Sequence, residues 1–177
     1  MRRLIFSSFF ILCAFAGLAQ QQQLPAAIKV PEGSRLILHA YAKGVQVYVC
    51  TRDAKDTSHY KWTFLEPRAN LYSSGDYQQH IGKHYLSAAK SPTWEIADGS
   101  TVSGAKLQQA SSPDSLSIPW LLLKTVVTGG KGKLNSIAFI QRVNTHGGAA
   151  PSKADGAQKG KLLEVPYTAE YLFYSGK

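Results

Sequence analysis

The stretch RLILHAYAKGVQVYVC, residues 35–50, decides the fold that we expect for this chain. Apolar and polar residues alternate over residues 35–42 and again over residues 45–50, which is the period of a half-buried β-strand. Lys43 and Gly44 interrupt the alternation, and such a break between two strand-like runs predicts a hairpin. The alternation also predicts a face that carries Gln46 and Tyr48, opposite a face of valines.

The rest of the chain repeats this pattern. Short apolar or alternating runs, separated by Gly, Pro and Asp turns, cover residues 60–64, 93–96, 101–107, 120–127, 134–143 and 169–174. The best helix candidates are residues 71–85 and 119–128, and the β-branched and aromatic content of the second favours a strand. We therefore predict a mainly β fold, a single antiparallel β-sandwich or barrel-like domain with few short helices.

The N-terminus has the three parts of a secretory signal peptide. Arg2 and Arg3 are followed by an apolar run up to Leu18, and Gly17 and Ala19 supply the small residues before a cleavage site. The run is shorter than the roughly 20 residues that span a bilayer, so we expect no membrane span. We predict a signal peptide over residues 1–19, a flexible leader over residues 20–31, a β-rich domain over residues 32–177, and export to the periplasm or the extracellular space.

Composition narrows the classes of partner. The chain has 177 residues, is 44% hydrophobic and 18% charged, and carries 20 Lys and Arg against 11 Asp and Glu, a formal net charge of +9. These values exclude a disordered tail. The basic residues are spread without a nucleic-acid motif, which favours an anionic or glycan cell-envelope ligand over nucleic acid. No phosphate loop, dinucleotide fingerprint or serine-hydrolase elbow occurs, so we expect no cofactor. The oligomeric state stays open.

Residues 80–100, HIGKHYLSAAKSPTWEIADGS, are the densest in functional side chains. His80 and His84 are four residues apart, a spacing that brings two metal ligands together on a helix, although Gly82 between them weakens a helix. They are weak metal candidates. Glu95 and Asp98 resemble in kind the carboxylate pair of sugar hydrolysis, with His84 as a third candidate catalytic residue. The alternative is that Asp98 belongs to a turn and that Glu95 is a solvated side chain.

The candidate ligand-binding residues are aromatic and polar groups near predicted strand ends: Trp94, Trp120, Tyr85, Arg142, Asn144 and His146. Aromatic rings stack on sugars and on flat or apolar ligands, and they also fill ordinary β cores. We favour a ligand- or surface-binding domain for an extracellular glycan or another cell-envelope component. The alternatives are a hydrolase or lyase that acts on an extracellular polymer through Glu95, Asp98 and His84, and a metal-binding protein that uses His80 and His84.

An ordered series of short strings resembles a known family. The strings are GVQVYVC (44–50), GKHY (82–85), PTWE (92–95), DGS (98–100), IPWLLLK (118–124), IQRVNT (140–145), GG (147–148) and VPYTAEY (165–171). Together they resemble the domain of unknown function 3455 family over residues 24–174. The resemblance implies one exported domain without an assigned activity. Family members commonly carry a second cysteine after the Gly-Gly segment, but residues 151–155 have none here, and we expect Cys50 to be a buried small hydrophobic residue.

Overall fold

The computed structural model describes residues 24–177, and the predicted signal peptide over residues 1–19 lies outside them. Within residues 24–177 the chain forms eight strands and three short 3-10 turns. The strands are β1 (Arg35–Arg52), β2 (Tyr60–Tyr72), β3 (His80–Leu86), β4 (Pro92–Ile96), β5 (Thr101–Ala110), β6 (Trp120–Gly129), β7 (Ile137–Gly147) and β8 (Leu162–Ser175). The turns are η1 (Ala26–Ile28), η2 (Lys133–Ser136) and η3 (Gly156–Gln158).

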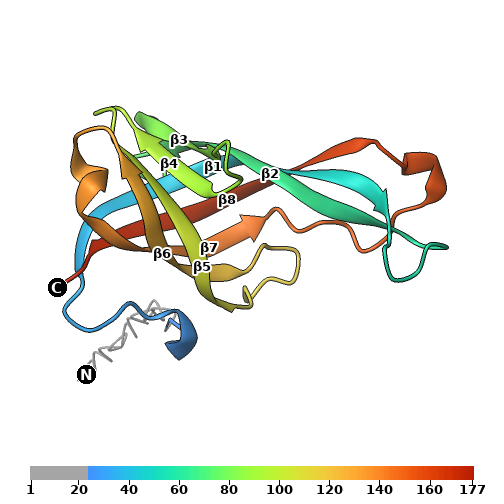
Figure 1. Ribbon diagram of the computed structural model, residues 1–177, viewed down its shortest axis with the longest axis horizontal. Coiled ribbons are helices and arrows are strands. Elements are labelled where there is room, and N and C mark those ends of the chain that lie inside the picture. The colour runs from blue at the N-terminus through green and yellow to red at the C-terminus, as the bar shows by residue number, and fades with distance from the viewer. Residues whose placement is uncertain (1–23) are drawn as a thin grey trace, which may run out of the picture.

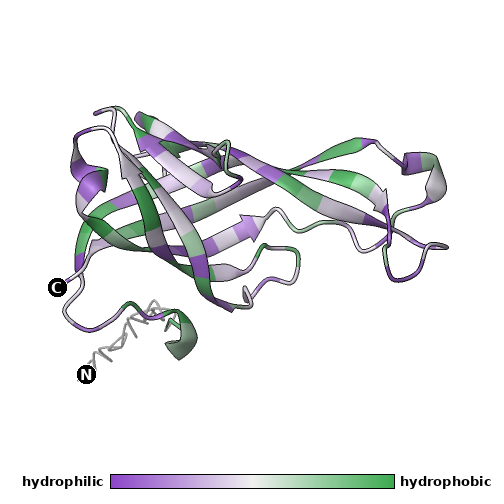
Figure 2. Ribbon diagram, viewed as in Figure 1, coloured by the Kyte–Doolittle hydropathy of each residue, from purple (hydrophilic) through white to green (hydrophobic). Residues whose placement is uncertain are grey.

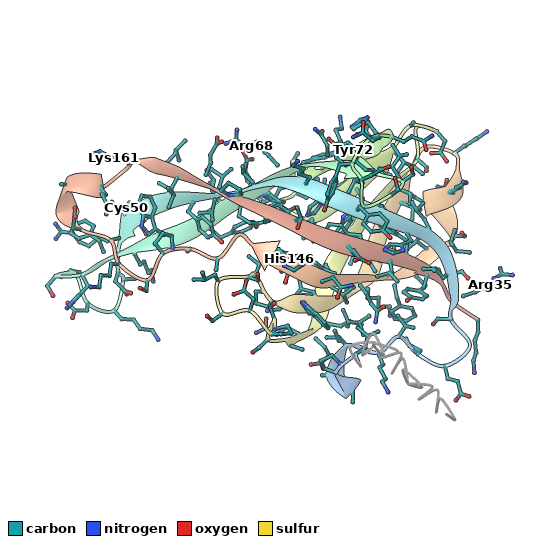
Figure 3. The ribbon with its side chains drawn as sticks, turned by 180° about the vertical axis from the view of Figure 1, so that it is seen from behind. Arg35, Cys50, Arg68, Tyr72, His146 and Lys161 are labelled. Carbon is teal, nitrogen blue, oxygen red and sulfur yellow. The ribbon has the colours of Figure 1, made fainter. Side chains whose placement is uncertain are left out.

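Each strand pairs antiparallel with the next one along the chain, and β8 returns to pair with β1, which closes a barrel. The prediction of a mainly β, antiparallel domain is therefore confirmed, and of the two expected architectures the barrel is the one observed. The strands β1, β2 and β8 continue beyond the body of the barrel as a twisted arm (Figure 1). Cys50 and Lys161 lie in this arm, and Arg35 lies at the opposite end of the molecule (Figure 3).

Alternation along the strands builds the core of the barrel. Figure 2 shows hydrophobic and hydrophilic residues alternating along the strands. On β8, Tyr171 and Phe173 are buried, and Ala40 of β1 lies directly opposite Tyr171. The small side chain of Ala40 leaves room for the rings of Tyr171, Phe173 and Trp94, which pack edge-on or tilted against one another. Burying each large apolar side chain contributes about 1.5–3 kcal/mol.

The prediction of a hairpin at Lys43 and Gly44 is wrong, because β1 runs straight through both residues. Gly44 lies opposite Ala69 of β2 and Tyr167 of β8. A Cβ atom on Gly44 would lie 2.1 Å from the backbone oxygen of Arg68, so the glycine permits close strand approach and makes no turn. Of the two helix candidates, residues 119–128 form β6, as the composition favoured, and residues 71–85 form the end of β2, a turn and β3.

The segment before β1 packs on the outside of the barrel. Ile28 in η1 is fully buried in a cluster with Trp120, Leu122 and Val143. The side-chain amide of Gln141 donates a hydrogen bond of 2.6 Å to the Ile28 carbonyl. Residues 24–31 are the described part of the leader predicted over residues 20–31, and within them η1 contacts β5 and β6. No helical segment in the described part of the chain has the length and apolar character to cross a membrane.

Candidate functional site

The barrel wall has an opening beside the hairpin formed by β3 and β4. The strand β2 pairs with β3 only over Ala69–Tyr72, and β5 pairs with β4 only over Thr101–Ser103. The hairpin ends at Leu86 and Pro92, while β2 and β5 run on past it with unpaired edges. A cavity of about 390 Å³ borders this gap, with a rim formed by Phe64, Pro67, Leu86, Pro92, Lys106 and Gln109.

The inner wall of the cavity is mostly apolar. Its remaining lining residues are Gln46, Tyr48, His84, Trp94, Ile118, Pro119, Leu121, Leu123, Arg142 and Tyr171. Among the described residues that line the cavity, Lys106 and Arg142 carry positive charge and none is acidic. The surface inside the barrel therefore combines an apolar wall with a positive electrostatic character.

A group of three stacked and tilted rings forms part of this wall. His84 and Trp94 are direct partners across β3 and β4, and their rings are parallel to within 8° with centroids 4.5 Å apart. The ring of Tyr171 lies 5.1 Å from His84 and 5.2 Å from Trp94. Direct cross-strand partners share one face of a sheet, so the pairing register is what brings the first two rings together.

His84 is a neutral imidazole in this setting. Burial disfavours the charged ring and lowers the pKa of His84 from its ordinary 6.5 to about 3. Its Nδ1 lies 2.9 Å from the Thr93 carbonyl oxygen, which can only accept, so Nδ1 carries the proton and donates. The other ring nitrogen, Nε2, is then a hydrogen-bond acceptor.

Several buried polar atoms at the cavity have no hydrogen-bond partner of good geometry within residues 24–177. They are Nε2 of Gln46, Nε1 of Trp94 and the hydroxyl of Tyr171, and the hydroxyl of the neighbouring Tyr167 shares this condition. Tyr167 contacts Gln46 and Tyr171, and Tyr171 contacts Arg142, closely enough for these neighbours to influence the pKa of both tyrosines after the larger effect of burial. Burial raises the pKa of both tyrosines, so both hydroxyls stay protonated and can donate. Buried polar groups in proteins nearly always have a partner, and these donors are placed where a molecule in the cavity could accept hydrogen bonds from them.

Arg142 adds a charge to this group of donors. It lies on β7 between Leu121 of β6 and Tyr171 of β8, directly opposite both. Its Nε and Nη2 donate to the Pro119 carbonyl oxygen at 3.1 and 2.8 Å, and no ion pair joins it to an acidic residue in the described part of the chain. Burial is the main influence on the pKa values of Tyr48, His84 and Tyr171, and the Arg142 charge lowers all three. The charge therefore lies beside the polar side chains of the cavity.

Of the predicted site residues, the structure brings His84, Trp94 and Arg142 together at the cavity.

The candidate catalytic residues His84, Glu95 and Asp98 do not converge on one site. Glu95 follows Trp94 on β4 and contacts Tyr85, which donates to it at 3.0 Å, and Lys83 at 3.3 Å. Asp98 lies in the β4–β5 turn, where it accepts from the backbone of Ser100 and Lys133 at 2.9 Å each. Adjacent residues on a strand face opposite sides, so Glu95 and Tyr85 do not line the cavity that Trp94 and His84 line.

The other predicted residues also lie away from the cavity. Trp120 packs against Ile28 in the outer cluster, Asn144 donates to Glu170 at 3.0 Å, and His146 is exposed. His80 is exposed and meets Tyr72 edge-on. On an extended strand four residues span roughly 13 Å, so the helical spacing assumed for His80 and His84 does not apply. Over residues 24–177, no group of three or more His, Cys, Asp or Glu side chains is placed to hold a metal ion.

Sequence reasoning missed several lining residues. The alternation in residues 169–174 contained the signal for Tyr171, and the predicted polar face of β1 contained Gln46 and Tyr48, which both line the cavity. Lys106 and Gln109 gave no such signal. They are three residues apart, so strict alternation places them on opposite faces, but a bulge between Lys106 and Gln108 lets both line the cavity.

Comparison with known proteins identifies a family. A family model described as "Protein of unknown function (DUF3455)" matches residues 31–175 of the chain. No curated protein and no solved structure matches it.

Proposed function

The chain belongs to the DUF3455 family of proteins of unknown function, and we propose that it is a binding protein that holds a small, mainly apolar molecule in the cavity beside the β3–β4 hairpin. The observation that carries this proposal is the set of unpartnered buried donors on Gln46, Trp94 and Tyr171, three residues that line one cavity. An isolated buried donor without a partner destabilises the fold, so retaining several around one cavity is consistent with a bound ligand.

The size and lining of the cavity indicate the kind of ligand. A volume of about 390 Å³ lies in the usual range for small-molecule sites and holds about 13 non-hydrogen atoms at roughly 30 Å³ each. Barrels of this strand number are wide enough for one small ligand. A glycan or other cell-envelope component fits this proposal as a single unit or an apolar portion of that size, because the volume of the cavity is too small for a longer polymer chain.

The geometry favours binding over the hydrolase or lyase that the sequence also suggested. Acid–base hydrolysis needs carboxylates or an equivalent pair beside the scissile bond. None of the described residues that line the cavity is acidic, and Glu95 and Asp98 are engaged elsewhere.

We further propose that the protein acts outside the cytoplasm, in the periplasm or the extracellular space, because residues 1–19 have the pattern of a signal peptide. N-terminal sequencing of the protein purified from its native cells tests this. A chain that begins at Gln20 supports export, and a cytoplasmic chain that retains Arg2 and Arg3 contradicts it.

Binding to the cavity is tested with 2-naphthol, an uncharged aromatic alcohol of about the right size, by isothermal titration calorimetry. Leu86 lines the rim of the cavity, so Leu86→Trp fills the opening. Leu116 is 74% exposed and does not line the cavity, so Leu116→Trp is the matched control. We expect the wild-type protein to bind 2-naphthol one to one. Leu86→Trp should weaken the affinity by roughly tenfold or more, and Leu116→Trp should keep it within about twofold of wild type. An absence of binding, or equal binding by both variants, would overturn the proposal.

A further inference from the structure

The geometry points to the chemical class of the ligand: we propose that the cavity selects a small organic carboxylate, with its head beside Arg142 and its apolar body along the leucine and aromatic wall. This inference rests on the proposed binding function and adds the identity of the head group.

The charge of the cavity favours an anion. Arg142 is half-buried, and no acidic side chain in residues 24–177 forms an ion pair with it. A partly buried cation is stabilised by a counter-ion, which the lining residues do not supply. Lys106 at the rim adds a second positive charge and bonds only to the neutral Gln109, at 3.0 Å. An anion entering past Lys106 therefore meets attraction at the rim and again at Arg142.

The buried donors of the cavity would be satisfied by a ligand that accepts hydrogen bonds. Nε2 of Gln46, Nε1 of Trp94 and the hydroxyl of Tyr171 can all donate, and they line the same cavity as Arg142. A carboxylate offers oxygens that only accept, so it satisfies donors without bringing a competing N–H or O–H. An amine brings only donors and a positive charge, so it is rejected by the same groups.

Arg142 is placed so that one ligand head group can form two hydrogen bonds, one of them to its guanidinium. Its bonds to the Pro119 carbonyl occupy Nε and one N–H of Nη2 and leave three N–H groups, both of Nη1 and the second of Nη2. Those bonds also fix the orientation of the guanidinium, and Leu121 and Tyr171, the direct strand partners of Arg142, line the same cavity. A planar carboxylate can bond to Nη1 and to a neighbouring donor together.

The test is isothermal titration calorimetry at neutral pH with four ligands that share an eight-carbon alkyl chain: octanoate, 1-octanol, octylamine and octyl sulfate. We expect wild-type protein to bind octanoate at least roughly tenfold more tightly than 1-octanol and octylamine, and the comparison with octyl sulfate tests whether the head-group site is specific for a carboxylate. Arg142→Met removes the charge and keeps an unbranched side chain, and it should remove the advantage of octanoate over 1-octanol, each measured on the same variant. Arg68→Met is the control, because Arg68 pairs with Glu66 and Glu164 and does not line the cavity.

The outcomes separate this inference from the proposed function. If 1-octanol binds as tightly as octanoate and Leu86→Trp blocks both, the cavity is a binding site and the carboxylate assignment is overturned. Octyl sulfate that binds as well as octanoate also overturns it, in favour of a general anion site. An advantage of octanoate over 1-octanol that survives Arg142→Met places the head elsewhere and contradicts the inference. If none of the four ligands binds and 2-naphthol does not bind either, the proposed function itself fails.

Discussion

The imidazole of His84 on β3 and the indole of Trp94 on β4 are stacked with ring centroids 4.5 Å apart and planes within 8° of parallel. Both side chains are almost fully buried and line the cavity. Because a charged ring in this place lacks solvation, the histidine behaves as a flat aromatic group that still offers one acceptor nitrogen. The same two side chains therefore pack the interior of the barrel and form part of the cavity wall.

The burial of His84 predicts a pH dependence of stability. The pKa of His84 is about 3 in the folded chain and ordinarily 6.5, so between these values the unfolded chain binds a proton that the folded chain does not. Stability is therefore lost as pH falls below about 6.5 and is unaffected by this group above it. We expect the free energy of unfolding to fall by up to about 1.4 kcal/mol per pH unit in that window. Urea denaturation at several pH values measures it, and His84→Gln should flatten the slope. Equal slopes for both proteins would contradict the prediction.

The close approach of β3 and β4 predicts that Gly82 cannot be replaced. A Cβ atom at Gly82 would lie 2.1 Å from the Glu95 carbonyl oxygen, which is fixed in the β3–β4 pairing. We expect Gly82→Ala to lower the free energy of unfolding by about 1–3 kcal/mol, as overpacking does. Gly176→Ala is the control, because the nearest atom to its new Cβ, on Ala138, is at an ordinary 3.5 Å. Chemical denaturation compares the two, and equal losses would refute the role given to Gly82.

The packing of the N-terminal segment predicts a stability contribution from Ile28. Its side chain is fully buried beside Trp120, and its carbonyl accepts from Gln141. We expect Ile28→Ala to lower the free energy of unfolding by about 2–5 kcal/mol. The neighbouring Lys29 is exposed, so Lys29→Ala should change it by less than about 0.5 kcal/mol. A thermal melt of Ile28→Ala that matches wild type would show that the segment is not part of the cooperative fold.

The position of Cys50 predicts an unreactive thiol. Cys50 is a free cysteine with 1% of its surface exposed, and the loop before β8 covers it through bonds from Cys50 to Lys161 and from Gly160 to Cys50. In the chain from Gln20 onward, we expect an aromatic disulfide reagent to label no thiol in the folded state and Cys50 after denaturation. Ser111 is exposed, so Ser111→Cys should react at once in the folded state. Rapid labelling of native Cys50 would mean that the loop opens readily.

The sequence predicted most of the strands, but it did not predict that β1 and β2 continue through residues that resemble turn residues. Alternation marks strands because one face of each is buried, and this held for β8, where buried and less buried residues alternate from Tyr167 to Ser175. It failed at Gly44 and Pro67, because a glycine at a close strand contact and a proline at an unpaired strand edge look like turn residues in the sequence.

The site was predictable only where local sequence carries the signal. Trp94, His84 and Arg142 stand out by residue type, and they do line the cavity. Their sequence neighbours Glu95 and Tyr85 were grouped with them because they are near in the chain, yet a strand turns adjacent residues to opposite faces. Gln46 and Tyr171 line the same cavity because β1 pairs with β8, and the local sequence carries no signal for that pairing.

The most direct test of a carboxylate-binding cavity is a crystal structure of the protein grown with 8-bromooctanoate, in which the bromine marks the chain end. We expect the carboxylate within hydrogen-bond distance of Arg142 and at least one of the unpartnered donors, with the alkyl chain along Leu121 and Trp94. A bromine outside the barrel, or a cavity filled by the protein's own side chains, would contradict the account.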